Sequence, residues 1–99
     1  MIHVMIENQK PFRNLQITGH AGAGVKGTDI VCAGVSTLFC TLVERLEQLH
    51  ARYSYVAESG LANVCLMGRR SKEENEAFDT IEAGLFLMAE KYPEYIKLL

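Results

Sequence analysis

The sequence lacks the features that would mark a nucleic-acid-binding, membrane or secreted protein. Its 99 residues carry a formal net charge of only −2, from 12 acidic and 10 basic side chains, so no strong overall field attracts nucleic acid or an anionic membrane. No apolar run approaches the roughly 20 residues of a membrane-spanning helix. The start, MIHVMIENQK, is too short and too soon polar for a signal peptide. These absences predict one cytoplasmic domain over residues 1–99.

Paired cysteines and closely spaced metal ligands are also missing. The cysteines Cys32, Cys40 and Cys65 are odd in number and form no Cys-x-x-Cys pair, whereas small secreted domains usually carry an even disulfide set. The histidines are scattered too, so a zinc site would have to be assembled from distant positions. The sequence contains no repeat and no low-complexity linker. It therefore predicts a globular domain without a structural metal.

What the sequence does contain is a 48% share of apolar residues, arranged in clear periods. Residues 2–7 and 12–19 alternate between apolar and polar, which predicts two strands joined by a turn. Residues 52–58 and 61–67 predict a second pair of strands. Ser59-Gly60 between them has the composition of a two-residue hairpin turn.

Two helices are expected between and after these hairpins. Asp29 stands directly before an apolar series with helical spacing, and it predicts a cap for a helix that begins at Ile30. Ser71 and Glu74 form a capping box for a second helix, which Pro93 ends.

The order ββαββα predicts an α+β fold of two layers: a mainly antiparallel four-stranded sheet with two helices on one face. Residues 94–99 are expected to form a last turn that packs back. The uncovered face of the sheet is expected to carry exposed apolar groups, which favours a homodimer.

Chemistry is concentrated between the first hairpin and the first helix. His20 ends a strand, and Cys32 lies in the first helical turn if Asp29 is the cap, with a glycine-rich loop between them. The start of a helix favours a thiolate through its dipole and unpaired N–H groups. A nearby imidazole could act as base and then as acid. A structural interpretation stays open, since a cysteine in an apolar helix is usually a small core residue; Cys40 and Cys65 are interpreted in that way.

The same loop offers a second hypothesis. Gly22, Gly24 and Gly27 match the pattern G-x-G-x-x-G between a strand and a helix, as in dinucleotide-binding folds. Asp29 at the helix start would repel a phosphate, however. No acidic residue follows at a strand end about 20 residues on, where a ribose-binding acid is expected.

A third hypothesis is a non-catalytic ribosome-associated module. Arg69, Arg70 and Lys72 form a local basic cluster, but no aromatic RNA-binding signature accompanies it. The cluster is therefore more typical of a solvated turn before the second helix.

One motif in residues 19–36 is specific enough to indicate a family. It consists of Gly19-His20-Ala21, Gly27 and the run Asp29-Ile30-Val31-Cys32-Ala33-Gly34. These residues and their spacing resemble the ribosomal-processing cysteine protease family, Prp. The resemblance implies a homodimeric bacterial cytosolic endopeptidase that needs no metal or organic cofactor. Its implied substrate is the N-terminal extension of large-subunit ribosomal protein twenty-seven, cut after a pair of phenylalanines and before an alanine.

The resemblance also implies roles for individual residues. Cys32 corresponds to the nucleophile and His20 to the general base and acid. Asp29 is expected to cap the helix and anchor the loop, and it is a candidate third member of the site. Ser36 matches the family's serine. Residues 21–28, with glycines at 22, 24 and 27, correspond to the family's mobile loop.

The implied substrate also needs an apolar groove for its aromatic side chains. Candidates to line that groove are Leu38, Phe39, Tyr53 and Tyr55.

Overall fold

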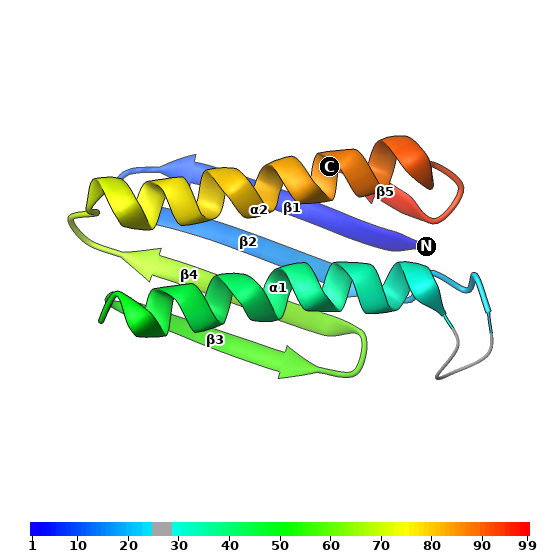
Figure 1. The fold of residues 1–99 in the computed structure, drawn as a ribbon, viewed down its shortest axis with the longest axis horizontal. Helices are drawn as coiled ribbons and strands as arrows, with labels where there is room; N and C mark the ends of the chain where they lie inside the picture. The colour runs from blue at the N-terminus through cyan, green and yellow to red at the C-terminus, as the bar shows by residue number, and fades with distance from the viewer. Residues whose placement is uncertain (25–28) are drawn as a thin grey trace.

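Both predicted hairpins are present in the computed structural model, which describes residues 1–24 and 29–99, and they join into one sheet (Figure 1). The elements are β1 (Ile2–Gln9), β2 (Phe12–Gly19), α1 (Ile30–Gln48), β3 (Tyr53–Glu58), β4 (Leu61–Met67), α2 (Lys72–Lys91) and β5 (Ile96–Leu98). The predicted α+β fold is confirmed. The first strand is longer than expected, because its polar end continues to pair with β2 through backbone groups, up to Gln9 opposite Phe12.

The sheet has five strands in the order β3-β4-β2-β1-β5, one more than the predicted four. Neighbouring strands are antiparallel, except that β5 runs parallel to β1 with Ile96 opposite Ile2. Three residues are too few to give a periodic signal in the sequence. They form a strand because the chain leaves α2 beside the unpaired edge of β1, where the Leu99 N–H donates to the Val4 carbonyl at 2.8 Å.

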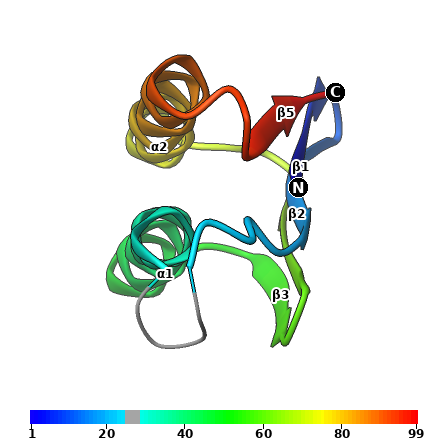
Figure 2. The ribbon, with the colours of Figure 1, turned by 90° about the vertical axis from the view of Figure 1, so that its right-hand side faces the viewer.

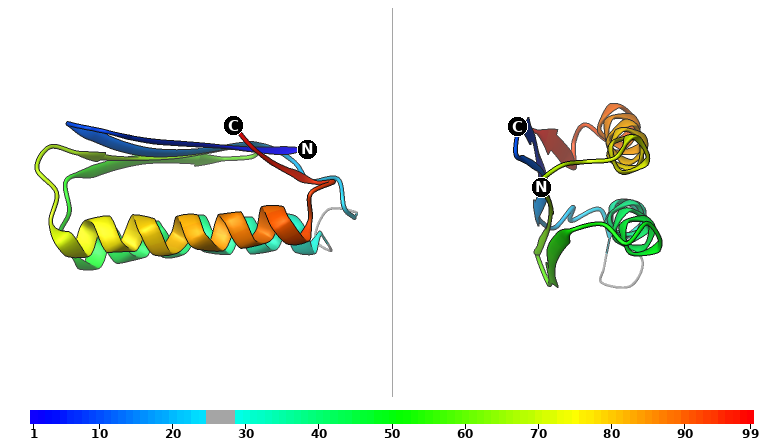
Figure 3. Two further views of the ribbon diagram at one scale, coloured as in Figure 1. Left: turned by 90° about the horizontal axis from the view of Figure 1, so that it is seen from above. Right: turned by 90° about the vertical axis from the view of Figure 1, so that its left-hand side faces the viewer.

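Both helices cover the same face of the sheet, as predicted, and they lie side by side in a second layer (Figures 2 and 3). Alternate side chains of the strands point toward them. The largest fully buried side chains between the layers come from three strands, β1, β2 and β4, and from the two helices: Phe78, Leu15, Leu42, Leu46, Leu66, Leu85, Val4, Val31 and Val64. In the described parts of the chain, no helix combines the length and the apolar character that crossing a membrane requires.

The predicted helix starts are confirmed. Asp29 is the N-cap of α1, which begins at Ile30. Ser71 is the N-cap of α2, and its side chain accepts from the Glu74 N–H while the Glu74 side chain accepts from the Ser71 N–H. Capping satisfies N–H groups that have no partner within the helix.

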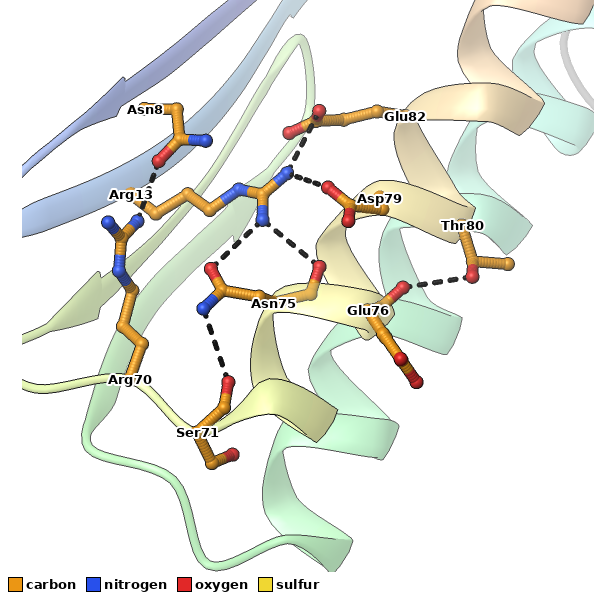
Figure 4. A network of polar contacts seen from close by, with 9 residues as sticks. All are labelled: Asn8, Arg13, Arg70, Ser71, Asn75, Glu76, Asp79, Thr80 and Glu82. Carbon is orange, nitrogen blue, oxygen red and sulfur yellow. Dashed lines mark hydrogen bonds and ion pairs between the residues drawn. The ribbon is translucent and has the colours of Figure 1, made fainter.

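A buried arginine fastens α2 to the sheet (Figure 4). Arg13 on β2 points toward the helices and is 2% exposed. Its guanidinium donates to the carbonyl and side-chain oxygens of Asn75, and to Asp79 and Glu82 at 2.5 and 3.1 Å. It also lies 5.0 Å from the centre of the Phe78 ring. The polar–apolar alternation of β2 gave no warning that a charged residue would face the core.

The uncovered sheet face is mixed rather than apolar. Phe12 and Val56 are exposed apolar side chains on this face, as predicted. Between them, however, Asn14 on β2 and Asn63 on β4 are diagonal neighbours and exchange side-chain hydrogen bonds of 3.0 and 3.2 Å.

Candidate active site

The end of β2 delivers His20 to one edge of the molecule. Gly19 ends the strand with a φ of +88°, and its N–H donates to the Gly60 carbonyl in the β3–β4 turn at 2.9 Å. The Met1 amino group donates to the His20 carbonyl at 2.6 Å. Backbone contacts from two other segments therefore fix the position of His20, while its side chain remains exposed.

Cys32 lies in the first turn of α1, three residues after the cap, as the sequence predicts. Its side chain is half-buried. The Ala21 N–H, in the residue directly after His20, donates to the Cys32 sulfur at 3.3 Å. This contact brings the two ends of the glycine-rich loop together and directs an N–H group at the sulfur.

Asp29 holds the same two chain segments through its carboxylate. One oxygen accepts from the N–H groups of Val31 and Cys32, both at 3.0 Å, and the other accepts from Ala23 at 3.0 Å. Hydrogen bonds to the charged form, the Cys32 N–H first among them, hold the pKa of Asp29 below its ordinary value of 3.8, although burial opposes this shift. Asp29 is thus both the helix cap and a loop anchor.

Two cavities that share part of their lining meet at these residues. The larger, of about 580 Å³, is lined by His20, Gly22, Gly24, Asp29, Cys32, Ala33, Ser36 and Ser59. The smaller, of about 220 Å³, also contacts His20, Cys32, Ser36 and Ser59, and its apolar wall includes Ile17, Val35, Leu61 and Ala62. Except for Gly27, which lies outside the described residues, the residues predicted to react, to support the reaction or to form the loop therefore border one connected region.

The imidazole and the thiol are neighbours in this region without being bonded. Within the described residues, no hydrogen bond links the side chains of His20 and Cys32. Instead, the His20 ring packs against the bare backbone of Gly60. Nor do the described residues contain a group of three or more His, Cys, Asp or Glu side chains able to hold a metal ion.

Sequence reasoning missed the contribution of the β3–β4 turn. The sequence predicts Ser59-Gly60 only as a turn, whereas in the structure both residues line the smaller cavity together with His20 and Cys32, and Ser59 also lines the larger one. The cause is the pairing of β2 with β4, which sets Thr18 opposite Leu61. No local pattern indicates which of the four strands become neighbours.

Several other candidates lie elsewhere. Phe39 belongs to the core at 3% exposure, so its assignment to a substrate groove was wrong. Leu38 packs against Gly84 on α2 and borders neither of the two cavities. The Tyr53 hydroxyl donates to Glu47 on α1 at 2.5 Å. Neither Tyr53 nor Tyr55 borders the two cavities.

The basic cluster is also far from the site. Arg69 and Arg70 follow β4 at the opposite end of the sheet, where Arg70 donates to Asn8 at 2.8 Å (Figure 4).

Comparison with known protein families identifies the family of this chain. The family model for the cysteine protease Prp matches residues 1–97. Comparison with curated protein sequences gave no match.

Solved structures extend the similarity to the whole fold. A crystal structure of an essential ribosomal processing protease Prp from Staphylococcus aureus, with a covalently linked product peptide, is 28% identical, with a TM-score of 0.88 over 99% of this chain and 97% of that one. The same protease with a substrate peptide is 27% identical, with a TM-score of 0.78 over 100% and 98%. A Streptococcus mutans protein is 29% identical, with a TM-score of 0.74 over 99% and 91%. The chain therefore belongs to the cysteine protease Prp family.

Proposed function

We propose that this chain is a cysteine endopeptidase of ribosome biogenesis. Its substrate is the N-terminal extension of large-subunit ribosomal protein twenty-seven, which it cuts after a Phe-Phe pair and before Ala. The observation that carries the proposal is the shared lining of two cavities by His20 and Cys32, with the sulfur at a helix start and facing an N–H donor. The family match supports the reaction type, and the peptide complexes of the Staphylococcus aureus protease support a peptide substrate.

The reaction proceeds by acyl transfer. Cys32 transfers its proton to His20, and the thiolate attacks the carbonyl carbon of the phenylalanine before the cut, forming a carbon–sulfur bond. The Ala21 N–H, whose nitrogen lies 3.3 Å from the sulfur, stabilises the negative charge of the thiolate. His20 then protonates the departing amine as the carbon–nitrogen bond breaks, which leaves a thioester. A water activated by His20 hydrolyses the thioester and restores the thiol.

This mechanism requires the imidazole and the sulfur to approach each other when substrate binds. Catalytic hydrogen bonds are often long in free enzymes and shorten only in the complex with substrate. The smaller cavity supplies the apolar wall that an aromatic side chain needs, through Ile17, Val35, Leu61 and Ala62.

Other residues support the two reacting groups. Asp29 positions the sulfur, because its carboxylate binds the Cys32 N–H and also fixes Ala23. Ser36 borders both cavities one turn beyond Cys32 and can contact the bound peptide. We further propose that the protein is a cytoplasmic homodimer. Its substrate partner is this ribosomal protein, and it makes no direct contact with nucleic acid. Sedimentation of the purified protein would give its oligomeric state.

The proposal is tested with a peptide that contains Phe-Phe-Ala at the end of the extension, followed by mass spectrometry. We expect wild type to cut between Phe and Ala, and Cys32→Ala and His20→Ala to lose at least about 10³-fold in rate, since neither remaining group can perform acyl transfer alone. Cys40→Ala is the matched control. Cys40 is not the core residue that the sequence suggested but an exposed cysteine on the same helix, so this variant should cut at the wild-type rate.

Two results would contradict the proposal. Full activity in Cys32→Ala would show that another group is the nucleophile. No cleavage by folded, reduced wild type would instead favour a binding module built on the glycine-rich loop.

A further inference from the structure

We propose that Gly60, in the β3–β4 turn, is a positioning residue for the His20 imidazole. The missing side chain at this position creates the surface on which the ring rests. The inference rests on the proposed function insofar as His20 is the base and acid of the reaction. The contact between Gly60 and the His20 ring is observed in the structure and does not depend on that function.

The contact is close enough that any side chain at position 60 would disturb it. A Cβ atom built on Gly60 would lie 3.1 Å from His20 Nε2, and 3.7 and 3.8 Å from Cδ2 and Cε1. Ordinary van der Waals contacts of a Cβ atom lie at 3.4–4 Å. One edge of the ring therefore faces the glycine directly, and an added Cβ would push the ring away by a few tenths of an ångström.

The turn is held in place relative to the histidine backbone. The Gly60 carbonyl accepts from the Gly19 N–H at 2.9 Å, one residue before His20. The next pair along the two strands is Thr18 opposite Leu61. These backbone hydrogen bonds fix the turn relative to the residues before His20. A shift of the turn therefore cannot make room for a Cβ on Gly60, and the imidazole must move.

A purely structural reason for Gly60 also exists, because its φ of +77° favours glycine in any case. The chain offers a matched control for that effect. Gly68, in the connection from β4 to α2, has the same φ of +77°. A Cβ built there would meet only Arg52 Nη1, at 4.0 Å. Substitutions at the two glycines therefore share the backbone strain, and only those at Gly60 displace His20.

The experiment compares Gly60→Ala with Gly68→Ala, and Gly60→Asn with Gly68→Asn. Asparagine tolerates positive φ better than alanine, so the second pair stays folded if the first does not. Two quantities are measured at a temperature where all variants are folded: the NMR signals of the His20 ring, assigned with His20→Gln, and kcat and KM for the Phe-Phe-Ala peptide.

We expect the Gly60 variants to shift the ring signals of His20 and to lower kcat about 3- to 30-fold, because a displacement of 1 Å in an active site can cost about 10²-fold. The Gly68 variants should keep the wild-type ring signals and kcat. The inference is overturned if the Gly60 variants match the Gly68 variants in both quantities, since Gly60 would then serve the turn alone.

The NMR measurement separates this inference from the proposed function. If wild type cuts no peptide, the proposed function fails, yet a shift of the His20 signals specific to Gly60 would still demonstrate the positioning contact. If wild type cuts the peptide, and the Gly60 variants match the Gly68 variants in their His20 ring signals and in kcat, only the inference fails.

Discussion

Replacing Arg13 by methionine should destabilise the protein strongly without impairing its active site. Among the described residues, the Arg13 guanidinium is the only cationic group that forms an ion pair with Glu82. The side chains of Arg13 and Glu82 are 3% and 12% exposed. Asp79, the other acidic partner, is 66% exposed, so that pair contributes at most about 1 kcal/mol. The dominant effect of the substitution is therefore the buried charge that it leaves on Glu82.

The magnitude follows from that uncompensated charge. Breaking a buried ion pair by removing one partner costs about 3 to 5 kcal/mol. Methionine retains apolar contact with the core in place of the arginine stem, so little of this cost comes from lost packing. The expected loss in the free energy of unfolding corresponds to a decrease in Tm of roughly 12 to 25 °C for a domain of this size.

The decisive measurement is a double-mutant cycle with Glu82→Gln, followed by urea unfolding. In wild type, Glu82→Gln should destabilise, because it weakens the contact to Arg13. In the Arg13→Met background the same change should stabilise, because it removes a buried charge without a partner. This reversal of sign would not arise if Arg13 and Glu82 contributed to stability only by filling space.

Activity provides the independent control. Arg13 lies near the start of β2 and His20 directly follows its end, so the two residues are about 23 Å apart at the usual rise of a strand. Arg13→Met should therefore keep the wild-type kcat at a temperature where it is fully folded. A loss below about 1 kcal/mol, or destabilisation by Glu82→Gln in both backgrounds, would refute the reasoning.

Two further predictions concern the loop anchor and the contact between the helices. Because the pKa of Asp29 is lowered from 3.8, its contribution to stability is present above that value and lost as pH falls through the lowered pKa. Urea unfolding from about pH 5 to pH 2 should therefore show a steeper loss for wild type than for Asp29→Asn, which keeps a capping side chain; parallel curves would contradict this. Between the helices, a Cβ on Gly84 would lie 2.7 and 3.2 Å from both Cδ atoms of Leu38, whereas a Cβ on Gly34 would meet the end of Met88 at 2.7 Å. Gly84→Ala should cost about 1 to 3 kcal/mol by overpacking. Gly34→Ala should stay within about 1 kcal/mol, because the unbranched Met88 can move and alanine favours the helix; equal costs in urea unfolding would show that Met88 is as constrained as Leu38.

The local elements of this protein were predictable because their signals are local. The bounds predicted for β2 and β4 are those observed, and Asp29 and Ser71 correctly predicted the starts of the two helices. Hydrogen bonds from a capping side chain reach only two or three residues, so the sequence around each start contains the whole motif. The placement of Cys32 in a first helical turn needed no more than this.

The assembly of the site was decided by contacts between distant residues. The pairing of β2 with β4 puts Gly60 beside His20, and the parallel pairing of β1 with β5 adds the strand that periodicity could not show. Arg13 is a further case, since its burial depends on acidic and amide groups more than 60 residues away. A sequence determines which groups can hydrogen-bond or pack, but which of them meet depends on the free energy of the whole fold. Only the tertiary structure therefore shows what surrounds the histidine and the cysteine.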